Sequence, residues 1–201
     1  MANAASRPEI LERFTKVVVQ SLRIDPSQVT EDAFLDDLGA ESLDLAEITM
    51  ESEEEFDILI PQKNILQTAT EVFGDGVLAR DGKLTEEGKR FLLRRMPEFP
   101  VNGNEIAVAD LSRQFLRVGT WVRMIEGLMA HTPRECARCG AAYGKPRAGR
   151  LKCASCAFEY DIPSGDDLNR LLDRAEHGCF VGASLTPKPA YRWRVNGVDF
   201  R

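Results

Sequence analysis

The sequence has no apolar run near the roughly 20 residues that a helix needs to span a bilayer. Its first residues, Met1 to Ser6, lack the basic patch and apolar core that mark a secretory signal. Of the 201 residues, 43% are hydrophobic and 29% are charged, which is ordinary for a soluble globular protein. We therefore expect a soluble, cytoplasmic protein without a membrane span.

Positive charge is absent from one long stretch of the chain. Between Arg23 and Lys63 there are 13 carboxylates and no Lys or Arg. Residues 1–130 carry 24 acidic and 14 basic side chains, net −10, whereas residues 131–201 carry 8 and 12, net +4. A strongly acidic surface repels nucleic acid and attracts basic protein surfaces, so the first part is not expected to bind DNA.

Hydrophobic spacing predicts a mainly α-helical chain. Ser6 and Glu9 have the spacing of a capping box, and apolar residues recur every fourth position from Ile10 to Leu22. Asp81 with Gly82, and Asn196 with Gly197, are typical of tight turns, the second within a β-hairpin of the tail. The further helices that we expect cover residues 42–57, 63–73, 85–96, 108–129 (with Gly119 as a point of interruption) and 164–178.

The segment from Phe34 to Asp44 contains Leu-Gly-Ala-Glu-Ser-Leu and ends at the start of a carboxylate-rich helix. Glu-Glu-Glu-Phe stands near the end of that helix, and Ile60-Pro61 follows. In order and spacing, residues 9–61 resemble the acyl carrier protein family, whose loop ends in Leu-Gly-x-Asp-Ser-Leu. The resemblance weakens through residues 62–105 and recovers at Val108-Ala109-Asp110-Leu111, so it covers about half of the chain.

The resemblance implies that Ser42 is esterified to 4'-phosphopantetheine, whose thiol carries the cargo as a thioester. The free amides and dipole of a helix N-terminus favour the phosphodiester. The alternative is that Ser42 only caps its helix, a common use of serine. Two positions depart from the family pattern: Glu41 replaces the usual aspartate, and Ser52 stands where an apolar side chain is usually buried.

The acidic helix has two interpretations. The carboxylates of the helix, Glu55 included, and those of the preceding loop, Asp36 included, can form a solvated face. The resemblance implies instead that this helix docks on basic patches of the phosphopantetheinyl transferase and of acyl-loading and acyl-processing enzymes. The candidate partner-binding residues are Asp37, Glu41, Leu43, Asp44, Ala46, Glu47, Met50, Glu53 and Glu54.

Four of the five cysteines form two Cys-x-x-Cys pairs, Cys136 with Cys139 and Cys153 with Cys156. Two such pairs supply the four thiolates of a structural zinc site, and a rubredoxin-like iron site uses the same ligands. We expect zinc, held in a ribbon whose short strands contain Leu151, Phe158, Tyr160 and Ile162. His131, His177 and Cys179 are the remaining metal-ligating side chains; a second site from them is the weaker hypothesis, and Cys179 fits a small buried apolar role.

These observations predict an all-helical, acyl-carrier-like domain over residues 1–130, with residues 62–105 inserted, and a zinc-ribbon-like domain with a helix and hairpin over 131–201. The expected function is that of a non-enzymatic carrier in a specialised fatty acid or polyketide-type pathway, with an aminoacyl or peptidyl cargo as the alternative. The rival from another class is an interaction or nucleic-acid-binding protein that uses the ribbon's basic and aromatic residues. Those residues are Arg138, Lys145, Arg147, Arg150, Lys152, Tyr191, Arg192, Trp193 and Arg194. The sequence does not identify the cargo or the partner enzymes.

Overall fold

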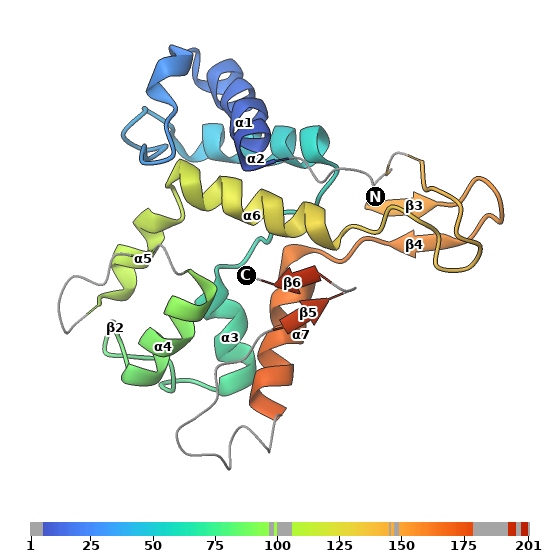
Figure 1. Ribbon diagram of the computed structural model, residues 1–201. Helices are drawn as coiled ribbons and strands as arrows, with labels where there is room; N and C mark the ends of the chain where they lie inside the picture. Colours follow the sequence, from blue (N-terminus) through green and yellow to red (C-terminus); the bar gives the residue numbers. More distant parts are fainter. Residues whose placement is uncertain are drawn as a thin grey trace. The chain divides into compact units, whose positions relative to one another are not determined.

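The computed structural model describes residues 6–96, 99, 106–144, 146, 149–178, 193–195 and 198–200 (Figure 1). The chain forms two compact units that alternate along the sequence. Unit 1 contains Met1–Ile60 and Leu116–Ser164, and unit 2 contains Pro61–Phe115 and Gly165–Arg201. The prediction of a mainly helical chain with a small C-terminal ribbon and hairpin is confirmed.

Unit 1 contains a helical bundle of α1 (Arg7–Leu22), α2 (Ser42–Phe56) and α6 (Val118–His131), with a short 3-10 helix at Pro26–Gln28. The predicted spacing in α1 buries Ile10, Phe14 and Val18 against α2 and α6. The ring of Phe14 stacks on Trp121 of α6 with centroids 5.4 Å apart. Ser6 is the N-cap of α1, but its side chain makes no capping hydrogen bond, so the predicted capping box is wrong.

The loop before α2 is fastened to the start of α6. Leu35 is fully buried, and its N–H donates to the carbonyl of Leu116 at 2.9 Å. The N–H of Gly119 donates to the carbonyl of Glu31, and a Cβ on Gly119 would lie 2.9 Å from that oxygen. Gly119 therefore does not interrupt the helix; it allows close packing, and the break between α5 and α6 lies at residues 115–117.

The ribbon also belongs to unit 1. Its strands β3 (Arg150–Lys152) and β4 (Glu159–Asp161) pair antiparallel, with Leu151 opposite Tyr160. Leu151 and Ile162 are buried. The predicted strands are thus confirmed at Leu151 and Tyr160, whereas Phe158 and Ile162 flank β4, and each cysteine pair lies at a turn.

Unit 2 has its own hydrophobic core, which includes Phe91, Leu92 and Leu111. The hairpin turn at Asp81 and Gly82 has φ of 51° and 74°, as predicted. The Thr85 hydroxyl accepts the N–H of Gly88 and caps the following helix. The elements of this unit are α3 (Ile65–Phe73), β1 (Ala79–Arg80), β2 (Lys83–Leu84), α4 (Glu86–Arg95), α5 (Val108–Gln114), α7 (Gly165–Gly178), β5 (Trp193–Val195) and β6 (Val198–Phe200).

Helix α7 joins unit 2 through α3 and α4. It packs along α3, and its Asp173 forms a buried ion pair with Arg95 of α4 at 2.9 Å. The carboxylate of Asp166 accepts the N–H groups of Gln62 and Lys63. This grouping differs from the predicted division at residue 130, and Leu111 lies in the core of unit 2 although the family pattern recovers there. Which parts fold independently stays a prediction.

No helix among the described residues is long and apolar enough to cross a membrane. Several predicted features lie outside the described residues, namely Cys179, Lys145, Arg147, Tyr191, Arg192 and the turn at Asn196 and Gly197.

Candidate functional site

Ser42 is the first residue of α2 and is exposed to solvent. The N-cap is Glu41, whose N–H donates to the carboxylate of Asp44 at 2.8 Å and whose carbonyl accepts the N–H of Leu45. The cap position is therefore occupied by a neighbour. This geometry disfavours the alternative in which Ser42 serves only as a cap.

Backbone turns in the loop before α2 position Ser42 at the start of the helix. The N–H of Gly39 donates to Asp36, and that of Ala40 donates to Leu35, whose side chain is fully buried. Gly39 has φ of 92°, a conformation that favours glycine. The buried leucine anchors the loop, so the serine hydroxyl is presented at a fixed point beside the free amides of the helix start.

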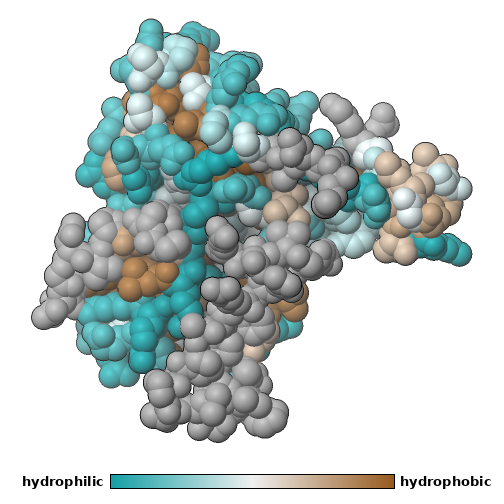
Figure 2. Space-filling view, viewed as in Figure 1, coloured by the Kyte–Doolittle hydropathy of each residue, from teal (hydrophilic) through white to brown (hydrophobic). Residues whose placement is uncertain are grey.

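One face of α2 is exposed and mixes apolar with acidic side chains. Leu43 is 81% exposed and Met50 is 70% exposed, which is unusual for large apolar residues. In the view of Figure 2, the surface over α1 and α2 is mostly hydrophilic, with hydrophobic side chains between the polar ones. The exposed residues at helical spacing on this face, called the α2 face below, are Leu43, Ala46, Glu47, Met50 and Glu54.

The other candidate partner-binding residues have different surroundings. Asp37 and Glu41 are exposed, while Asp44 is half-buried at the cap. Glu53 is half-buried, and its carboxylate accepts the N–H of Ile60 at 2.8 Å. Glu53 therefore does not belong to a fully solvated acidic face, because its carboxylate holds the chain that leaves the helix.

Sequence reasoning did not find the role of Arg13. Its guanidinium donates to the carboxylate of Glu55 at 2.7 Å and lies 4.5 Å from the ring centroid of Phe56. These contacts draw Glu55 toward α1 and away from the α2 face. An arginine 42 positions earlier offers no sequence signal for this pairing.

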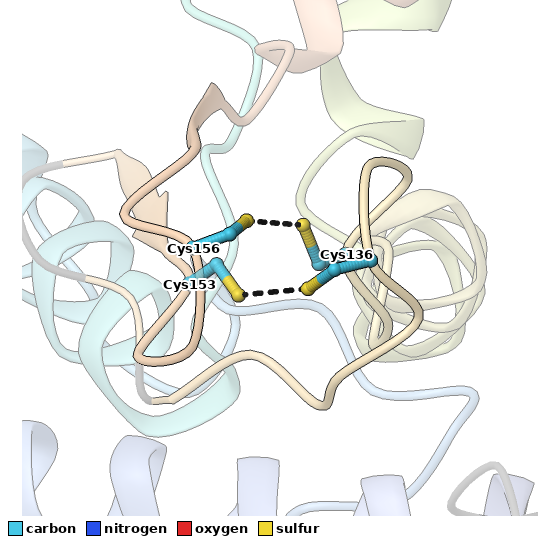
Figure 3. Close-up of side chains that lie close together, drawn as sticks. Cys136, Cys153 and Cys156 are labelled. Atoms are coloured by element: carbon cyan, nitrogen blue, oxygen red, sulfur yellow. Dashed lines mark hydrogen bonds between the residues drawn. The ribbon is translucent and has the colours of Figure 1, made fainter.

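The four cysteines meet at one point of the ribbon. Their sulfur atoms all lie within 4.8 Å of one another. Sγ of Cys136 is 3.6 Å from that of Cys156, and Sγ of Cys139 is 3.5 Å from that of Cys153. Figure 3 shows the sulfur atoms of the two turns pointing toward one another. The sequence prediction that these four residues come together is thus matched by the geometry.

The two cysteine turns have the same backbone bonds. Cys136 accepts from the N–H of Gly140 and donates to Ala141, while Cys153 accepts from Ala157 and donates to Phe158. The residue that follows each pair has a left-handed conformation, with φ of 73° at Gly140 and 56° at Ala157. The second turn therefore places an alanine where the first has glycine.

The thiols differ in acidity. Burial raises the pKa of Cys136, but the N–H groups of Arg138 and Cys139 outweigh it and the pKa falls to about 6. The N–H of Cys156 lowers the pKa of Cys153. Although the N–H of Ala141 opposes it, hydrogen bonding with the neighbouring thiols raises the pKa of Cys139 to about 12. Cys136 and Cys153 are thus more acidic than an ordinary thiol, whereas Cys139 is less acidic.

These residues fit a tetrahedral metal. With metal–sulfur bonds of about 2.3 Å, the sulfur atoms of a tetrahedral site are about 3.8 Å apart. The observed separations lie close to this value. Four thiolates leave no open coordination position, so such a metal would have a structural role.

The two histidines of the weaker second-site hypothesis have other contacts. His131 is buried, and its Nδ1 lies 2.5 Å from the carbonyl of Gly127. The ring of Phe73 packs edge-on against His177.

Comparison with known proteins identifies the N-terminal part. The family model described as the phosphopantetheine attachment site matches residues 12–70. Acyl carrier protein of Caulobacter vibrioides is 59% identical over 54 residues, which cover 26% of this chain and 69% of that protein. Acyl carrier protein of Zymomonas mobilis is 48% identical over 60 residues, 29% of this chain and 77% of that protein. No solved structure gives a significant match. The chain therefore belongs to the acyl carrier protein family.

Proposed function

We propose that the chain carries an acyl intermediate as a thioester on a 4'-phosphopantetheine arm at Ser42. The observation that supports this most directly is the exposed Ser42 at the start of α2, with the cap formed by Glu41 and Asp44. The hydroxyl is open to a transferase, and the helix N-terminus favours the negative phosphodiester. The chain itself is proposed to be no catalyst, and its partners perform the chemistry.

The α2 face is the proposed docking surface for the phosphopantetheinyl transferase and the enzymes that load and process the cargo. Charge complementarity speeds encounter, and a surface that relies on it suits brief visits to several enzymes. Leu43, Ala46 and Met50 would supply apolar contact, while Glu47 and Glu54 would steer basic surfaces. Asp37 and Glu41 flank Ser42, whereas Asp44 and Glu53 support the helix ends. A specialised fatty acid or polyketide-type pathway and a cytoplasmic location complete the proposal.

The four cysteines are proposed to hold zinc, with iron as the alternative. Four thiolates fill every coordination position of the metal, so its role in the ribbon is structural. The surface of the ribbon is proposed to bind protein. Two of the basic residues that a nucleic-acid-binding ribbon would need are already paired across the hairpin. Arg150 contacts Asp161 at 2.7 Å, and Lys152 contacts Glu159 at 3.2 Å. These pairs reduce the positive potential and favour a protein partner.

The proposal is tested by incubating the full chain with coenzyme A and a broad-specificity phosphopantetheinyl transferase. Intact mass should show one added arm in the wild type and none in Ser42→Ala. Loading the arm with acyl-coenzyme A and with aminoacyl donors then separates the two cargo classes. A wild type and a Glu41→Asp variant that both stay unmodified would contradict the carrier function, and elemental analysis of the same sample tests the metal.

A further inference from the structure

The residues that follow α2 contact the base of the ribbon. Cδ1 of Leu59 lies 3.1 Å from the position that a Cβ on Gly149 would occupy. Gly149 has φ of 72° and directly precedes β3, which leads into Cys153. Its carbonyl accepts the N–H of Ile162 at 2.8 Å, which closes the base of the hairpin. The end of α2 and the cysteine ribbon therefore meet at Leu59 and Gly149.

The end of α2 is held from its own side as well. Asp57 ends the helix in a left-handed conformation, with φ of 55°. Ile58 donates its N–H to the carbonyl of Glu53, and Ile60 donates to the Glu53 carboxylate. Ile58 and Ile60 are buried, whereas Leu59 is half-buried and reaches the ribbon. Residues 57–60 are thus held by the burial of Ile58 and Ile60, by Glu53 and, through Leu59, by the ribbon.

The ribbon is joined to the bundle at a second point. Helix α6 ends at His131, five residues before Cys136. His131 is buried, and Thr132 donates to the carbonyl of Leu128. The ribbon is therefore linked both to α6 and to the end of α2. All three parts belong to unit 1.

We propose that the metal-bound ribbon positions the C-terminal end of α2, with Leu59 and Gly149 as the positioning residues. The inference rests on the proposed metal site and the proposed carrier function. A hairpin of two three-residue strands is marginally stable alone, and small thiolate domains commonly need their metal to fold. Loss of the metal therefore frees Gly149 and removes the packing of Leu59, so the turn keeps the Glu53 contact and the burial of Ile58 and Ile60 without the support of the ribbon.

The effect on function follows from where the turn lies. Glu54 and Met50 of the α2 face lie in the last two turns of the helix, and the ribbon contact at Leu59 follows the end of the same helix. Ser42 begins the helix at its other end, about 20 Å away at about 1.5 Å per residue. Metal loss should therefore raise the KM for enzymes that dock on α2 while the kcat of arm transfer changes little.

Hydrogen exchange on the full chain provides the test, with metal-loaded and chelated samples compared under reducing conditions. The amide of Ile60 should exchange at least about tenfold faster after chelation, as local opening becomes easier. Leu59→Ala should give the same acceleration and a several-fold higher KM for the transferase while its metal content is unchanged. Leu59→Met, which keeps an apolar side chain of similar size, should restore both values toward the wild type.

A second readout follows the bundle itself. Trp121 is 8% exposed and stacks on Phe14, and Trp193 is the other tryptophan of the chain. In a Trp193→Phe background, Trp121 fluorescence reports whether the bundle stays folded when the metal is removed. The expected result is a retained Trp121 signal together with faster exchange at residues 58–60, since the ribbon and the turn are released while the core of the bundle stays packed.

The outcomes separate the proposals. If the chain binds no metal, both the metal site and this inference fail; if Ser42 accepts no arm, the carrier function fails. A chain that binds metal and accepts the arm, yet shows equal exchange at Ile60 with and without metal, overturns the positioning role alone. Metal-bound Leu59→Ala with wild-type exchange and KM would also overturn it.

Discussion

Ser42 differs from an ordinary capping serine in one respect. Its neighbour Glu41 occupies the cap, and the Asp44 carboxylate accepts the Glu41 N–H. Replacing Ser42 by alanine therefore leaves the capping contacts in place and should cost less than the roughly 1 kcal/mol of a lost cap. This small cost makes Ser42→Ala a suitable negative control for arm attachment, because the variant keeps its fold.

The two cysteine turns give a matched pair of substitutions. Ala157 is held in the left-handed region, where a Cβ costs roughly 1–2 kcal/mol, while Gly140 occupies the equivalent place without that cost. Nothing lies within 4 Å of a Cβ on Gly140, so conformation alone decides the effect there. Ala157→Gly should stabilise the metal-bound ribbon by about 1 kcal/mol, and Gly140→Ala should destabilise it by a similar amount.

Competition for metal with a chromophoric chelator measures this difference. The Ala157→Gly ribbon should release its metal at a higher chelator concentration than the wild type, and Gly140→Ala at a lower one. Equal release by all three proteins would show that the conformation of these residues does not limit ribbon stability.

The ion pair of Glu31 with Arg7 predicts how stability changes at acid pH. Its carboxylate accepts bonds from Arg7 at 3.0 and 2.7 Å, and the hydrogen bond with Arg7 holds the pKa of Glu31 below its usual value. A lowered carboxyl pKa stabilises the fold above the unfolded value of about 4.3, and the contribution disappears as pH falls through the folded pKa. Both side chains are more than one third exposed, so the pair contributes at most about 1 kcal/mol.

Arg7→Ala should therefore lower the free energy of unfolding near neutral pH, and the difference from the wild type should shrink as pH falls through the lowered pKa of Glu31. Urea unfolding followed by circular dichroism at several pH values measures it. A difference that stays constant from pH 7 to below pH 3 would contradict the role of the ion pair.

At the scale of the helix, α2 has a solvent-exposed face, and Glu53 near its C-terminal end supports the chain that follows. Charge reversal of Glu47 and Glu54 should weaken docking of the phosphopantetheinyl transferase by about tenfold or more, because steering depends on surface charge. The loss should shrink as salt screens the interaction. Glu53→Lys differs, since its carboxylate supports Ile60, and it should destabilise the fold by about 1–3 kcal/mol.

Transferase KM at two salt concentrations, together with thermal unfolding of each variant, separates the two effects. The Glu47→Lys, Glu54→Lys protein should keep its melting temperature and lose affinity. If its KM equals that of the wild type at low salt, the α2 face is a solvated surface without a docking role.

Two helical glycines have opposite surroundings. A Cβ on Gly88 of α4 would lie 1.9 Å from the carbonyl oxygen of Leu78, whereas nothing lies within 4 Å of a Cβ on Gly127 of α6. Gly88→Ala should cost about 3 kcal/mol or more, because backbone has to move. Gly127→Ala should gain up to about 1 kcal/mol, since alanine is the better helix former.

Chemical denaturation of the two alanine variants measures this contrast. Tolerance of Gly88→Ala at wild-type stability would contradict the close packing of α4 on the hairpin, and the Gly127 variant controls for the general effect of alanine in a helix.

Element positions were predictable where local chemistry decides them. The spacing of Ile10, Phe14 and Val18 indicated α1, and the turn residues Asp81 and Gly82 indicated the first hairpin. Gly119 was predicted as an interruption because sequence reasoning treats an isolated glycine as a breaker. Its actual role depends on the carbonyl of Glu31, which lies 88 positions earlier and leaves no local signal.

For the whole molecule, contacts between residues far apart in the sequence decide which elements belong to which unit. The ribbon follows α6 and shares unit 1 with the bundle, while α7 returns to α3 and unit 2. The contact of Leu59 with Gly149 and the ion pair of Arg95 with Asp173 underlie this interleaving. Neither pair is marked by spacing or motif, so the sequence predicted the two sites but not the grouping of the parts around them.

The most direct test of the central claim locates the arm within the chain. Because Lys and Arg are absent between Arg23 and Lys63, trypsin should release residues 24–63 as one peptide, which contains Ser27, Ser42 and Ser52. Tandem mass spectrometry of protein modified by the transferase should place one phosphopantetheine on Ser42. An arm on Ser27 or Ser52, or a peptide that remains unmodified with several transferases, would contradict the carrier function assigned to Ser42.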